Sequence, residues 1–265
     1  MKDIKKLFVE CGIEDVGVCS FTDDLIFPYA RSKTRLPERA KSILVCLFPY
    51  FAGVPEKRNL ALYCMIQDYH RVVGECLQNA VDRLQRRYPN NRFVWFVDAS
   101  PIDEVQAACQ AGLGLFGKNR QLLTERYGSM VFIGEIVTDL ALPAGEPMGN
   151  CMNCGECIRA CPTKALTEAG INRSLCRSHI TQIKGVLNPQ QQGEVTKGGM
   201  AWGCDRCILA CPQNSEIEPT PFAAFYEEQV AILTEENLDL LMTNRAFAWK
   251  GREVVLRNLR LLNKK

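Results

Sequence analysis

At 265 residues, the chain is long enough for about two domains and a sizeable core. Its 32 Lys and Arg residues against 30 Asp and Glu residues give a net charge of +2, which neither favours nor excludes a nucleic-acid partner. No apolar run approaches the roughly 18 residues of a membrane-spanning helix, so we expect no membrane partner. The chain has only two histidines, which argues against a histidine-based metal catalyst. Its charged first residues, with no apolar signal region, predict a reducing, cytoplasmic location.

Buried strands and helices alternate in the first part of the chain, which predicts a domain of α/β or α+β class over residues 1–147. Continuous apolar runs are typical of buried strands, and apolar residues at intervals of three and four are typical of helices. In chain order, the sequence predicts a helix over 1–11, strands over 15–20 and 43–48, a long helix over 60–88, a strand over 93–97, a helix from a Ser100 cap to Gly112, and a strand over 130–137. The segment 142–147, with two prolines, then marks the domain boundary.

Two places in this domain are candidates for ligand binding. The strand over 93–97 delivers Asp98 to its carboxyl end, the edge where ligands bind in open α/β sheets. A buried carboxyl there would have the raised pKa of a general acid, whereas the alternative is a cap or turn residue. The segment 31–39 carries four basic residues, of which Arg31 is the first, and is either a solvated loop or a grip on an anionic ligand. The glycine-rich segment 112–119 lacks the P-loop pattern.

The stretch from Cys151 to Pro212 carries the strongest motif. Its first run, C-M-N-C-G-E-C-I-R-A-C-P, has the spacing of two-cluster ferredoxins, in which three thiolates bind one 4Fe-4S cluster and the fourth binds the other. The second run, C-D-R-C-I-L-A-C-P, has Ala201 where a first cysteine is expected, and Cys176 is the natural replacement. We predict a ferredoxin-like module over 148–218, with cluster one on Cys151, Cys154, Cys157 and Cys211 and cluster two on Cys161, Cys176, Cys204 and Cys207. With four thiolates each, both clusters would carry electrons rather than act as Lewis acids.

Other uses of these eight cysteines fit less well. Two zinc sites of four thiolates would tolerate the C-x2-C pairs but have no use for a compact four-cysteine run that ends in proline. Disulfides conflict with a reducing location. The other six cysteines lie in apolar contexts and are predicted to be mostly core residues.

Residues 219–265 are predicted to form a short helical C-terminal segment. Its last part, 245–265, holds seven basic residues against one acid, Glu253, a local charge of +6. Arg257, Arg260 and Lys264 are predicted to share one helical face. Such a face is by default solvated, and the alternative is contact with the phosphate backbone of a nucleic acid.

Five stretches together resemble the epoxyqueuosine reductases, the cobalamin and iron-sulfur enzymes that finish queuosine on tRNA. They are D-Y-H at 68–70, V-D-A-S-P-I-D-E at 97–104, A-G-L-G-L-F-G-K-N at 111–119, Y-G-S-M-V-F-I-G-E-I-V-T-D-L at 127–140, and the cysteine framework with its single Cys176. The resemblance covers residues 43–265, and the combination of motifs is specific.

The resemblance implies a nitroreductase-like α/β domain that binds cobalamin, fused to the double-cluster module. The clusters would reduce cobalamin, and Asp98 would donate a proton to the substrate, epoxyqueuosine in tRNA. An external low-potential donor would supply the electrons. The residues implied to bind cobalamin are Lys118, Asn119 and Leu122, and we add Arg31 to them. The residues implied to lie near the substrate are Asp68, Tyr69 and His70.

One near match bears on the cobalt. The segment D-Y-H-R-V-V-G approaches the D-x-H-x-x-G motif of other cobalamin proteins, but Gly74 comes one residue late and the segment lies in a predicted helix. We therefore expect cobalamin bound base-off, without a histidine ligand.

The chain also departs from the family. Val105 stands where a basic residue usually follows Glu104, the N-terminal region lacks the family's tryptophan and His-Gly-x-Met segment, and no helical-repeat extension follows the clusters. A shortened reductase and a paralogue with another substrate both fit. A non-catalytic electron carrier is the alternative from another class, although a carrier needs no proton donor at Asp98.

Overall fold

The structure, a computed structural model, describes residues 2–264 and divides into two compact units. Unit 1 comprises Met1–Pro49 and His70–Met152, and unit 2 comprises Tyr50–Tyr69 and Asn153–Lys265. Over the described residues, none of the helices combines the length and the apolar character that crossing a membrane requires.

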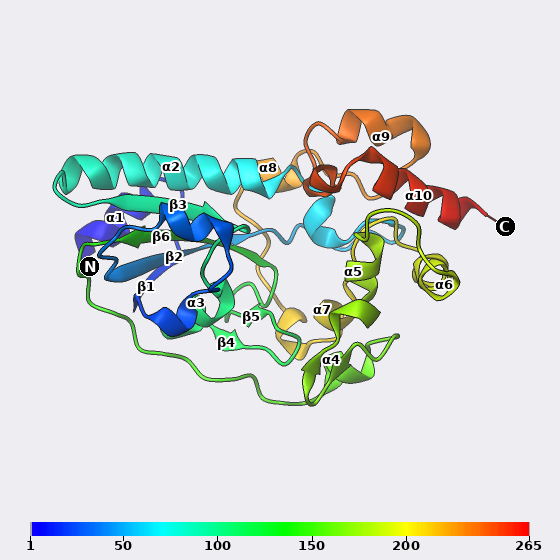
Figure 1. The fold of residues 1–265 in the computed structure, drawn as a ribbon, viewed down its shortest axis with the longest axis horizontal. Helices are drawn as coiled ribbons and strands as arrows, with labels where there is room; N and C mark the ends of the chain where they lie inside the picture. The colour runs from blue at the N-terminus through cyan, green and yellow to red at the C-terminus, as the bar shows by residue number, and fades with distance from the viewer. Residues whose placement is uncertain (1, 265) are drawn as a thin grey trace. The chain divides into compact units, whose positions relative to one another are not determined.

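Unit 1 has a mixed α/β fold with a four-stranded sheet between helices (Figure 1). The strand order is β1 (Val16–Ser20), β2 (Ser42–Pro49), β6 (Val131–Thr138) and β3 (Phe93–Val97). Helix α2 (Tyr69–Arg87) covers one face and α3 (Glu104–Gln110) the other, while α1 (Lys2–Val9) and the hairpin of β4 (Leu115–Phe116) and β5 (Leu122–Leu123) complete the unit. Strands form at all four predicted places because β-branched and aromatic residues pack well on a pleated, buried surface.

All three strand pairings in this sheet are antiparallel. Asp98 does follow the carboxyl end of β3, but the rule that ligands bind at that edge of open α/β sheets concerns parallel strands and does not apply here. Asp98 lies at a turn directly after β3, with a backbone φ of 57°. That left-handed conformation is uncommon for a residue other than glycine and is often found at functional sites.

Side-chain alternation assigns the two faces of β6. Gly134 faces α2, where a Cβ atom would lie only 2.8 Å from Leu77 and 3.2 Å from Val73. Ile133 and Val137 face the other way and share a core cluster with Ala107 and Ala108 of α3 and with strand residues. Glu135 has the same parity as Ile133 and Val137, so its side chain points toward the α3 face.

Two predicted helices begin later than expected. The long helix starts at Tyr69 rather than Leu60, because the preceding residues belong to unit 2 and bond within it: Ala61 N donates to Trp202 O at 2.9 Å, and Leu62 N donates to the Asp205 carboxylate at 3.0 Å. Helix α3 starts at Glu104 with Asp103 as its cap, since the Asp103 carboxylate accepts a hydrogen bond from Gln106 N at 3.2 Å. Ser100 is not the cap; its hydroxyl accepts a bond from Ile102 N at 3.1 Å.

Unit 2 is built mainly from short helices around buried aromatic side chains. Trp202 and Phe247 pack with ring centroids 6.1 Å apart, and Phe225 is also fully buried. Its elements are α4 (Glu156–Arg159), β7 (Leu166–Thr167), β8 (Gly170–Ile171), α5 (Arg177–Thr181), α6 (Pro189–Gly198), α7 (Arg206–Leu209), α8 (Ala223–Tyr226), α9 (Glu235–Leu241) and α10 (Arg252–Asn263). Unit 2 thus differs from the predicted contiguous domains: residues 50–69 join it, and residues 153–218 and 219–265 lie in one compact unit.

Candidate functional site

Asp98 and His70 lie together in unit 1. His70 is in the first turn of α2, and its Nε2 atom lies 3.1 Å from Asp98 Oδ2. The two side chains are 34% and 56% exposed, so they form an open pair that a ligand can reach. An imidazole beside a carboxyl group can orient that group and exchange a proton with it. The sequence placed both residues at the site but did not predict their contact.

The loop after Asp98 is held by backbone hydrogen bonds. Phe27 N donates to Pro101 O at 2.8 Å, and Asp103 N donates to Leu25 O at 2.8 Å. These bonds tie residues 101–103 to the segment after β1. Asp98 is therefore presented between a buried strand and a fixed loop.

The G-K-N turn, residues Gly117, Lys118 and Asn119, connects β4 to β5 in the same unit. Gly117 N donates to Gln121 O at 2.8 Å, and a Cβ atom on Gly117 would lie 2.5 Å from Asn119 Oδ1, so the tight turn requires glycine. Asn119 is 5% exposed, and its Oδ1 accepts a bond from Gln121 N at 3.2 Å. Leu122 is buried in β5, and Arg31 lies exposed in another segment, the 3-10 helix Arg31–Arg35.

A buried donor in this turn fits the cofactor that the sequence implies. Asn119 Nδ2 is buried and has no hydrogen-bond partner within residues 2–264. A buried unpaired amide costs free energy, and an oxygen acceptor of a bound ligand would relieve that cost. The amide side chains of a corrin ring offer such oxygens.

The first predicted cluster ligand is joined to this turn. Cys151 N donates to Phe116 O at 3.1 Å, and Phe116 N donates to Gly149 O at 2.9 Å. Residues 149–151 therefore pair with β4, immediately before the G-K-N turn. Within unit 1, the start of the cysteine motif and the predicted corrin-binding segment form one hydrogen-bonded structure.

The four cysteines predicted for cluster two lie close together in unit 2. Burial raises the pKa of Cys207 to about 12, with added repulsion from Cys204, Cys176, Cys161 and Cys157 in that order. Four half-buried thiols within electrostatic reach of one another suit a cluster whose irons neutralise the thiolates. No three His, Cys, Asp or Glu side chains among residues 2–264 are grouped to hold a single metal ion. In a 4Fe-4S cluster each thiolate binds a different iron, so the ligands need not converge on one point.

Hydrogen-bond donors surround this group of thiols. Burial disfavours the Cys161 thiolate, but bonds from the Leu166, Thr163 and Ala165 peptides and the Thr163 side chain lower its pKa overall. The Thr163 hydroxyl lies 3.7 Å from Cys161 Sγ. Arg177, which follows Cys176, is 7% exposed and has a buried Nε–H with no partner among the described residues. Donors to sulfur are expected around an iron-sulfur cluster.

A buried ion pair supports the loop that carries Cys204 and Cys207. Asp205, whose side chain is 1% exposed, binds Arg58 Nη1 and accepts a bond from Leu62 N at 3.0 Å. Arg58 also donates to Leu60 O at 2.8 Å. The segment 58–62 is thereby fixed to the C-D-R-C motif, a contact that the sequence pattern did not reveal.

The remaining predicted ligands and substrate residues are distributed as follows. Cys154 is exposed and Cys157 buried on either side of Gly155, and Arg159 donates to Cys154 O at 2.8 Å. Cys211 caps the 3-10 helix Pro212–Asn214. Asp68, in unit 2, donates its backbone N–H to Asn244 O at 3.2 Å, and Tyr69 begins α2.

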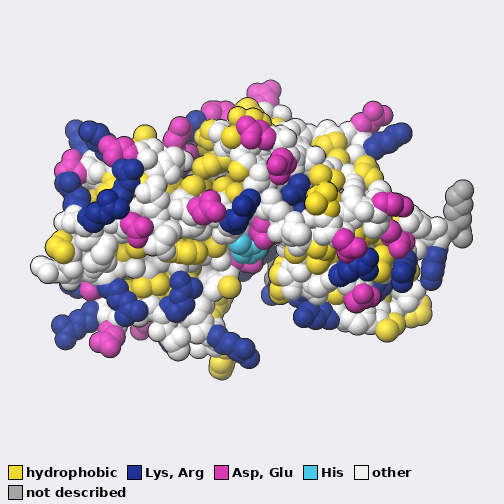
Figure 2. All heavy atoms as spheres, turned by 90° about the horizontal axis from the view of Figure 1, so that it is seen from above, with side chains coloured by type: hydrophobic (Ala, Val, Ile, Leu, Met, Phe, Trp, Pro, Cys, Tyr) yellow, Lys and Arg dark blue, Asp and Glu magenta, His cyan; other side chains and the backbone are white. Residues whose placement is uncertain are grey.

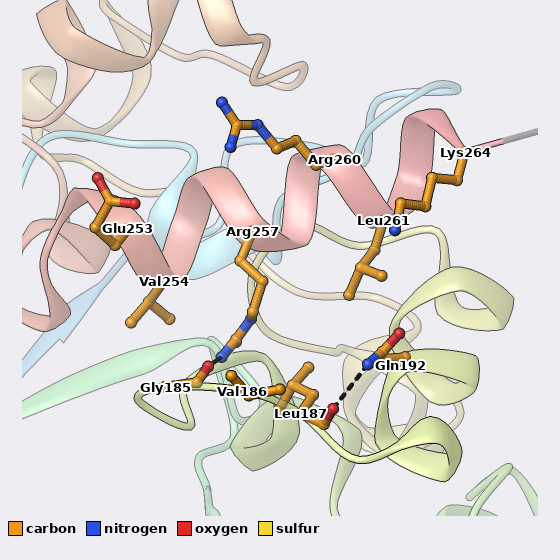
Figure 3. Close-up of a pocket in the computed structure, with 10 residues that line it drawn as sticks. All are labelled: Gly185, Val186, Leu187, Gln192, Glu253, Val254, Arg257, Arg260, Leu261 and Lys264. Atoms are coloured by element: carbon orange, nitrogen blue, oxygen red, sulfur yellow. Dashed lines mark hydrogen bonds between the residues drawn. The ribbon is translucent and has the colours of Figure 1, made fainter.

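The basic C-terminal helix is more structural than its sequence suggests. Figure 3 shows Arg257 reaching down from α10 toward Gly185, on one side of a cavity of about 420 Å³. Its Nη1 donates to Ile183 O and Gly185 O, each at 2.6 Å. Arg260 points away from that loop in the same view, and its guanidinium lies 3.7 Å from the Glu235 carboxylate. The prediction that Arg257 and Arg260 form one solvated face is therefore wrong for Arg257.

Charged side chains are mixed over the visible surface. On the face shown in Figure 2, basic and acidic groups are interspersed, consistent with the net charge of +2. On the C-terminal segment, Arg252 binds Asp239, and Arg245 is buried against backbone carbonyls, which reduces the charge free to meet an anion.

Comparisons with known proteins agree with this arrangement. The family model described as "4Fe-4S double cluster binding domain" matches residues 150–214, and the one described as "Epoxyqueuosine reductase QueG, DUF1730" matches residues 31–99. Together with the eight motif cysteines, the first match defines the class: an iron-sulfur protein whose double-cluster binding domain is joined to a mixed α/β unit.

Curated relatives then define the family. Epoxyqueuosine reductase of Synechocystis sp. is 31% identical over 207 residues, which cover 75% of this chain and 71% of that protein. The enzyme of Lactococcus garvieae is 33% identical over 205 residues, covering 73% of this chain and 58% of that protein. The chain belongs to the epoxyqueuosine reductase family. It spans about half the length of several curated relatives. The protein of Gloeobacter violaceus, for example, is 37% identical over 167 residues, which cover 62% of this chain and 52% of that protein.

Solved structures share the fold. Epoxyqueuosine reductase from Streptococcus thermophilus matches with a TM-score of 0.81 at 22% identity, over 98% of this chain and 80% of that one. A crystal structure of epoxyqueuosine reductase with an epoxyqueuosine-modified tRNA-Tyr stem loop matches with a TM-score of 0.82 at 22% identity, over the same shares. The reductive dehalogenase NpRdhA matches with a TM-score of 0.57 at 17% identity, over 99% of this chain and 36% of that one.

Proposed function

We propose that this protein reduces epoxyqueuosine to queuosine in tRNA, using two 4Fe-4S clusters and cobalamin. The observation that carries the proposal is the bond between Cys151 N and Phe116 O, which joins the cysteine motif to the G-K-N turn in one unit. Electron transfer requires a cluster close to the acceptor, and this pairing supports cluster one as the donor to cobalamin. A structural relative is titled as a complex with an epoxyqueuosine-modified tRNA stem loop, which supports the substrate.

The site residues take distinct roles in this proposal. Lys118, Asn119 and Leu122 of the turn region hold the cofactor, with Asn119 Nδ2 donating to one of its amide oxygens, and Arg31 binds an anionic group of it. Cobalamin, when bound, supplies a cobalt centre that passes electrons to the substrate. It would be held base-off without a histidine ligand, because His70 contacts Asp98 instead.

Asp98 supplies the proton. Removing an epoxide oxygen as water consumes two electrons and two protons, so a positioned acid is needed where the carbon–oxygen bonds break. His70 holds the Asp98 carboxyl in place at 3.1 Å. Asp68 and Tyr69, which directly precede His70 in the chain, are assigned to substrate binding on the family resemblance alone. The electrons come from an external low-potential donor through cluster two and then cluster one. A tRNA substrate would place the reaction in the cytoplasm.

The test combines cofactor binding with a nucleoside assay. Protein reconstituted anaerobically with iron, sulfide and cobalamin should convert epoxyqueuosine in a tRNA stem loop, measured by liquid chromatography of the nucleosides. Asp98→Asn should lower kcat by about 10²–10⁴-fold, the usual contribution of a general acid. The matched control is Asp24→Asn, since Asp24 is an exposed carboxyl in the same unit.

Three outcomes would refute parts of the proposal. No cobalamin binding would favour a plain electron carrier. Binding without conversion of epoxyqueuosine would favour another substrate. A cobalt spectrum with an imidazole ligand would refute the base-off assignment.

A further inference from the structure

The buried carboxyl of Glu135 has no role in the function proposed above. Glu135 lies in the middle of β6, opposite Val45 of β2 and Phe96 of β3, and is 0% exposed. Neither carboxylate oxygen has a close hydrogen-bond partner within residues 2–264, although the Ser100 side chain lies near enough to act on the carboxyl. A carboxylate buried in this way is very costly, so the group is held as a neutral acid. An acid held in the core without a counter-ion costs free energy and therefore calls for another explanation.

Glu135 faces the beginning of α3 and the loop that carries Asp98. Side chains alternate between the two faces of β6, and that of Glu135 points to the α3 face, as do those of Ile133 and Val137. Glu104 is the first residue of α3. Burial is the main cause that raises the pKa of Glu135 well above its usual range, followed by repulsion from Glu104, with Asp103 and Asp98 adding smaller contributions and Ser100 opposing the rise. Burial, with repulsion from Asp98 and then Asp103, raises the pKa of Glu104 to about 8.

The other polar groups on this face do not neutralise the pair. Cys19 of β1 and Cys46 of β2 both lie within electrostatic reach of Glu135, and burial keeps both thiols protonated. Arg35 is a cation near this side; its guanidinium lies 4.6 Å above the Phe96 ring and donates to Trp95 O at 2.9 Å. Val105, the residue after Glu104, is apolar and packs against the core. Burial and neighbouring carboxyls raise the pKa of both Glu135 and Glu104, and within residues 2–264 no cation offsets that rise.

We propose that the half-buried Glu104 and the buried Glu135 form a carboxylic-acid pair that stores a proton for Asp98. The inference rests on the proposed reductase function. Asp98 donates its proton to the epoxide oxygen as the first carbon–oxygen bond breaks, and Glu104 then returns a proton to Asp98. Asp98 donates again as the second carbon–oxygen bond breaks, so that oxygen leaves as water. The two electrons come from the external donor through the clusters and cobalamin.

The pair can supply a proton to Asp98 when the bound substrate blocks exchange with water. Asp98 is 56% exposed when free, but a bound tRNA would cover it and limit its exchange with water. A second acid behind Asp98 supplies the second proton while the substrate is in place. After donation, the Glu104 carboxylate shares the remaining proton of Glu135, as two neighbouring carboxyls do when they hold one proton between them. The pair is refilled from water through Asp98 after the product leaves.

The test uses the full chain loaded with clusters and cobalamin, in the variants Glu135→Leu, Glu135→Gln and Glu104→Gln. Glu75→Gln, which alters an exposed carboxyl on α2, is the matched control. Infrared spectra at pH 7 should show protonated-carboxyl absorption that loses intensity in Glu135→Leu and in Glu104→Gln and keeps its intensity in Glu75→Gln. Glu135→Leu should raise Tm, because it removes an unpaired polar group from the core. It should also lower kcat roughly tenfold at unchanged KM, with a steeper loss as pH rises.

Each outcome decides a different point. A purely structural role for Glu135 predicts a lower Tm in Glu135→Leu with kcat unchanged per folded molecule, and that result would overturn the proposal. So would protonated-carboxyl absorption of undiminished intensity in Glu135→Leu, or a wild-type pH profile in both Glu104→Gln and Glu135→Leu. A wild-type protein that binds cobalamin but never reduces epoxyqueuosine would instead refute the proposed function on which the relay rests.

Discussion

Replacing Asp205 by asparagine tests the contact that fixes the cluster-two loop. The Asp205 side chain is 1% exposed and that of Arg58 is 14% exposed, so little solvent can compensate for a lost charge. Asparagine keeps an acceptor for Leu62 N but leaves the guanidinium without its anion. Breaking a buried pair from one side typically costs about 3–5 kcal/mol. Arg58 keeps its bond to Leu60 O, so we expect about 3 kcal/mol.

The assay is urea unfolding of reconstituted protein, followed by tryptophan fluorescence, because Trp202 lies buried in the same unit. Arg58→Met combined with Asp205→Leu should cost less than either single change, since it leaves no buried charge. The control is Asp3→Asn, which breaks the exposed pair of Asp3 and Arg87 and should cost under about 1 kcal/mol. A cost for Asp205→Asn no larger than that of the control would refute the reasoning.

Three further predictions concern the pH response, the C-terminal helix and cluster two. The Glu104 pKa is about 8 in the folded protein against an ordinary 4.5, so the contribution of Glu104 to stability is complete below about pH 4.5 and is lost as pH rises through 8. The urea concentration at the unfolding midpoint should therefore fall between pH 5 and 9, and Glu104→Gln should make that fall smaller. Equal slopes in the wild type and the variant would contradict this prediction. Arg257→Met should lower Tm, because it leaves the carbonyls of Ile183 and Gly185 without their donor, while Arg260→Met should leave Tm nearly unchanged. A larger loss of Tm in Arg260→Met than in Arg257→Met would argue against a structural role of Arg257. Thr163→Val removes a donor to Cys161 and should make the reduction potential of one cluster more negative in an EPR-monitored titration. Thr167→Val is the control. Identical cluster potentials in the wild type and Thr163→Val would show that the hydroxyl does not contact the cluster.

The parts of the fold that follow from local patterns were predictable from the sequence. Apolar runs found all four strands, and cysteine spacing defined the double-cluster domain that a family model matches at residues 150–214. Strand direction was not predictable, because an apolar run reads the same in a parallel and an antiparallel sheet. The helix start at Tyr69 also escaped prediction, since tertiary bonds to Trp202 and Asp205 override the helical pattern of the preceding residues.

The candidate site divides in the same way. Motifs pointed to Asp98, to His70 and to the G-K-N turn, but the contact between His70 and Asp98 joins residues 28 positions apart and needs coordinates. Glu135 did carry a signal: it is a charged residue in an otherwise apolar strand, V-F-I-G-E-I-V-T, where a core position is expected. Arg257 shows the opposite error, because a helical-wheel pattern cannot reveal backbone carbonyls contributed by a distant loop.

The interleaved composition of unit 2 affects how the chain can fold during synthesis. Residues 50–69 leave the ribosome well before residues 153–265, to which they are bonded through Ala61 and Trp202. A nascent chain must therefore keep this apolar segment, with its buried Leu60 and Met65, uncovered until residues 153–265 have been made. A truncated gene that begins at the cysteine motif would encode a product without the Arg58 anchor and with an exposed Trp202 surface. Expression of that fragment should give aggregated protein, whereas the whole chain can close the unit in a late, long-range step.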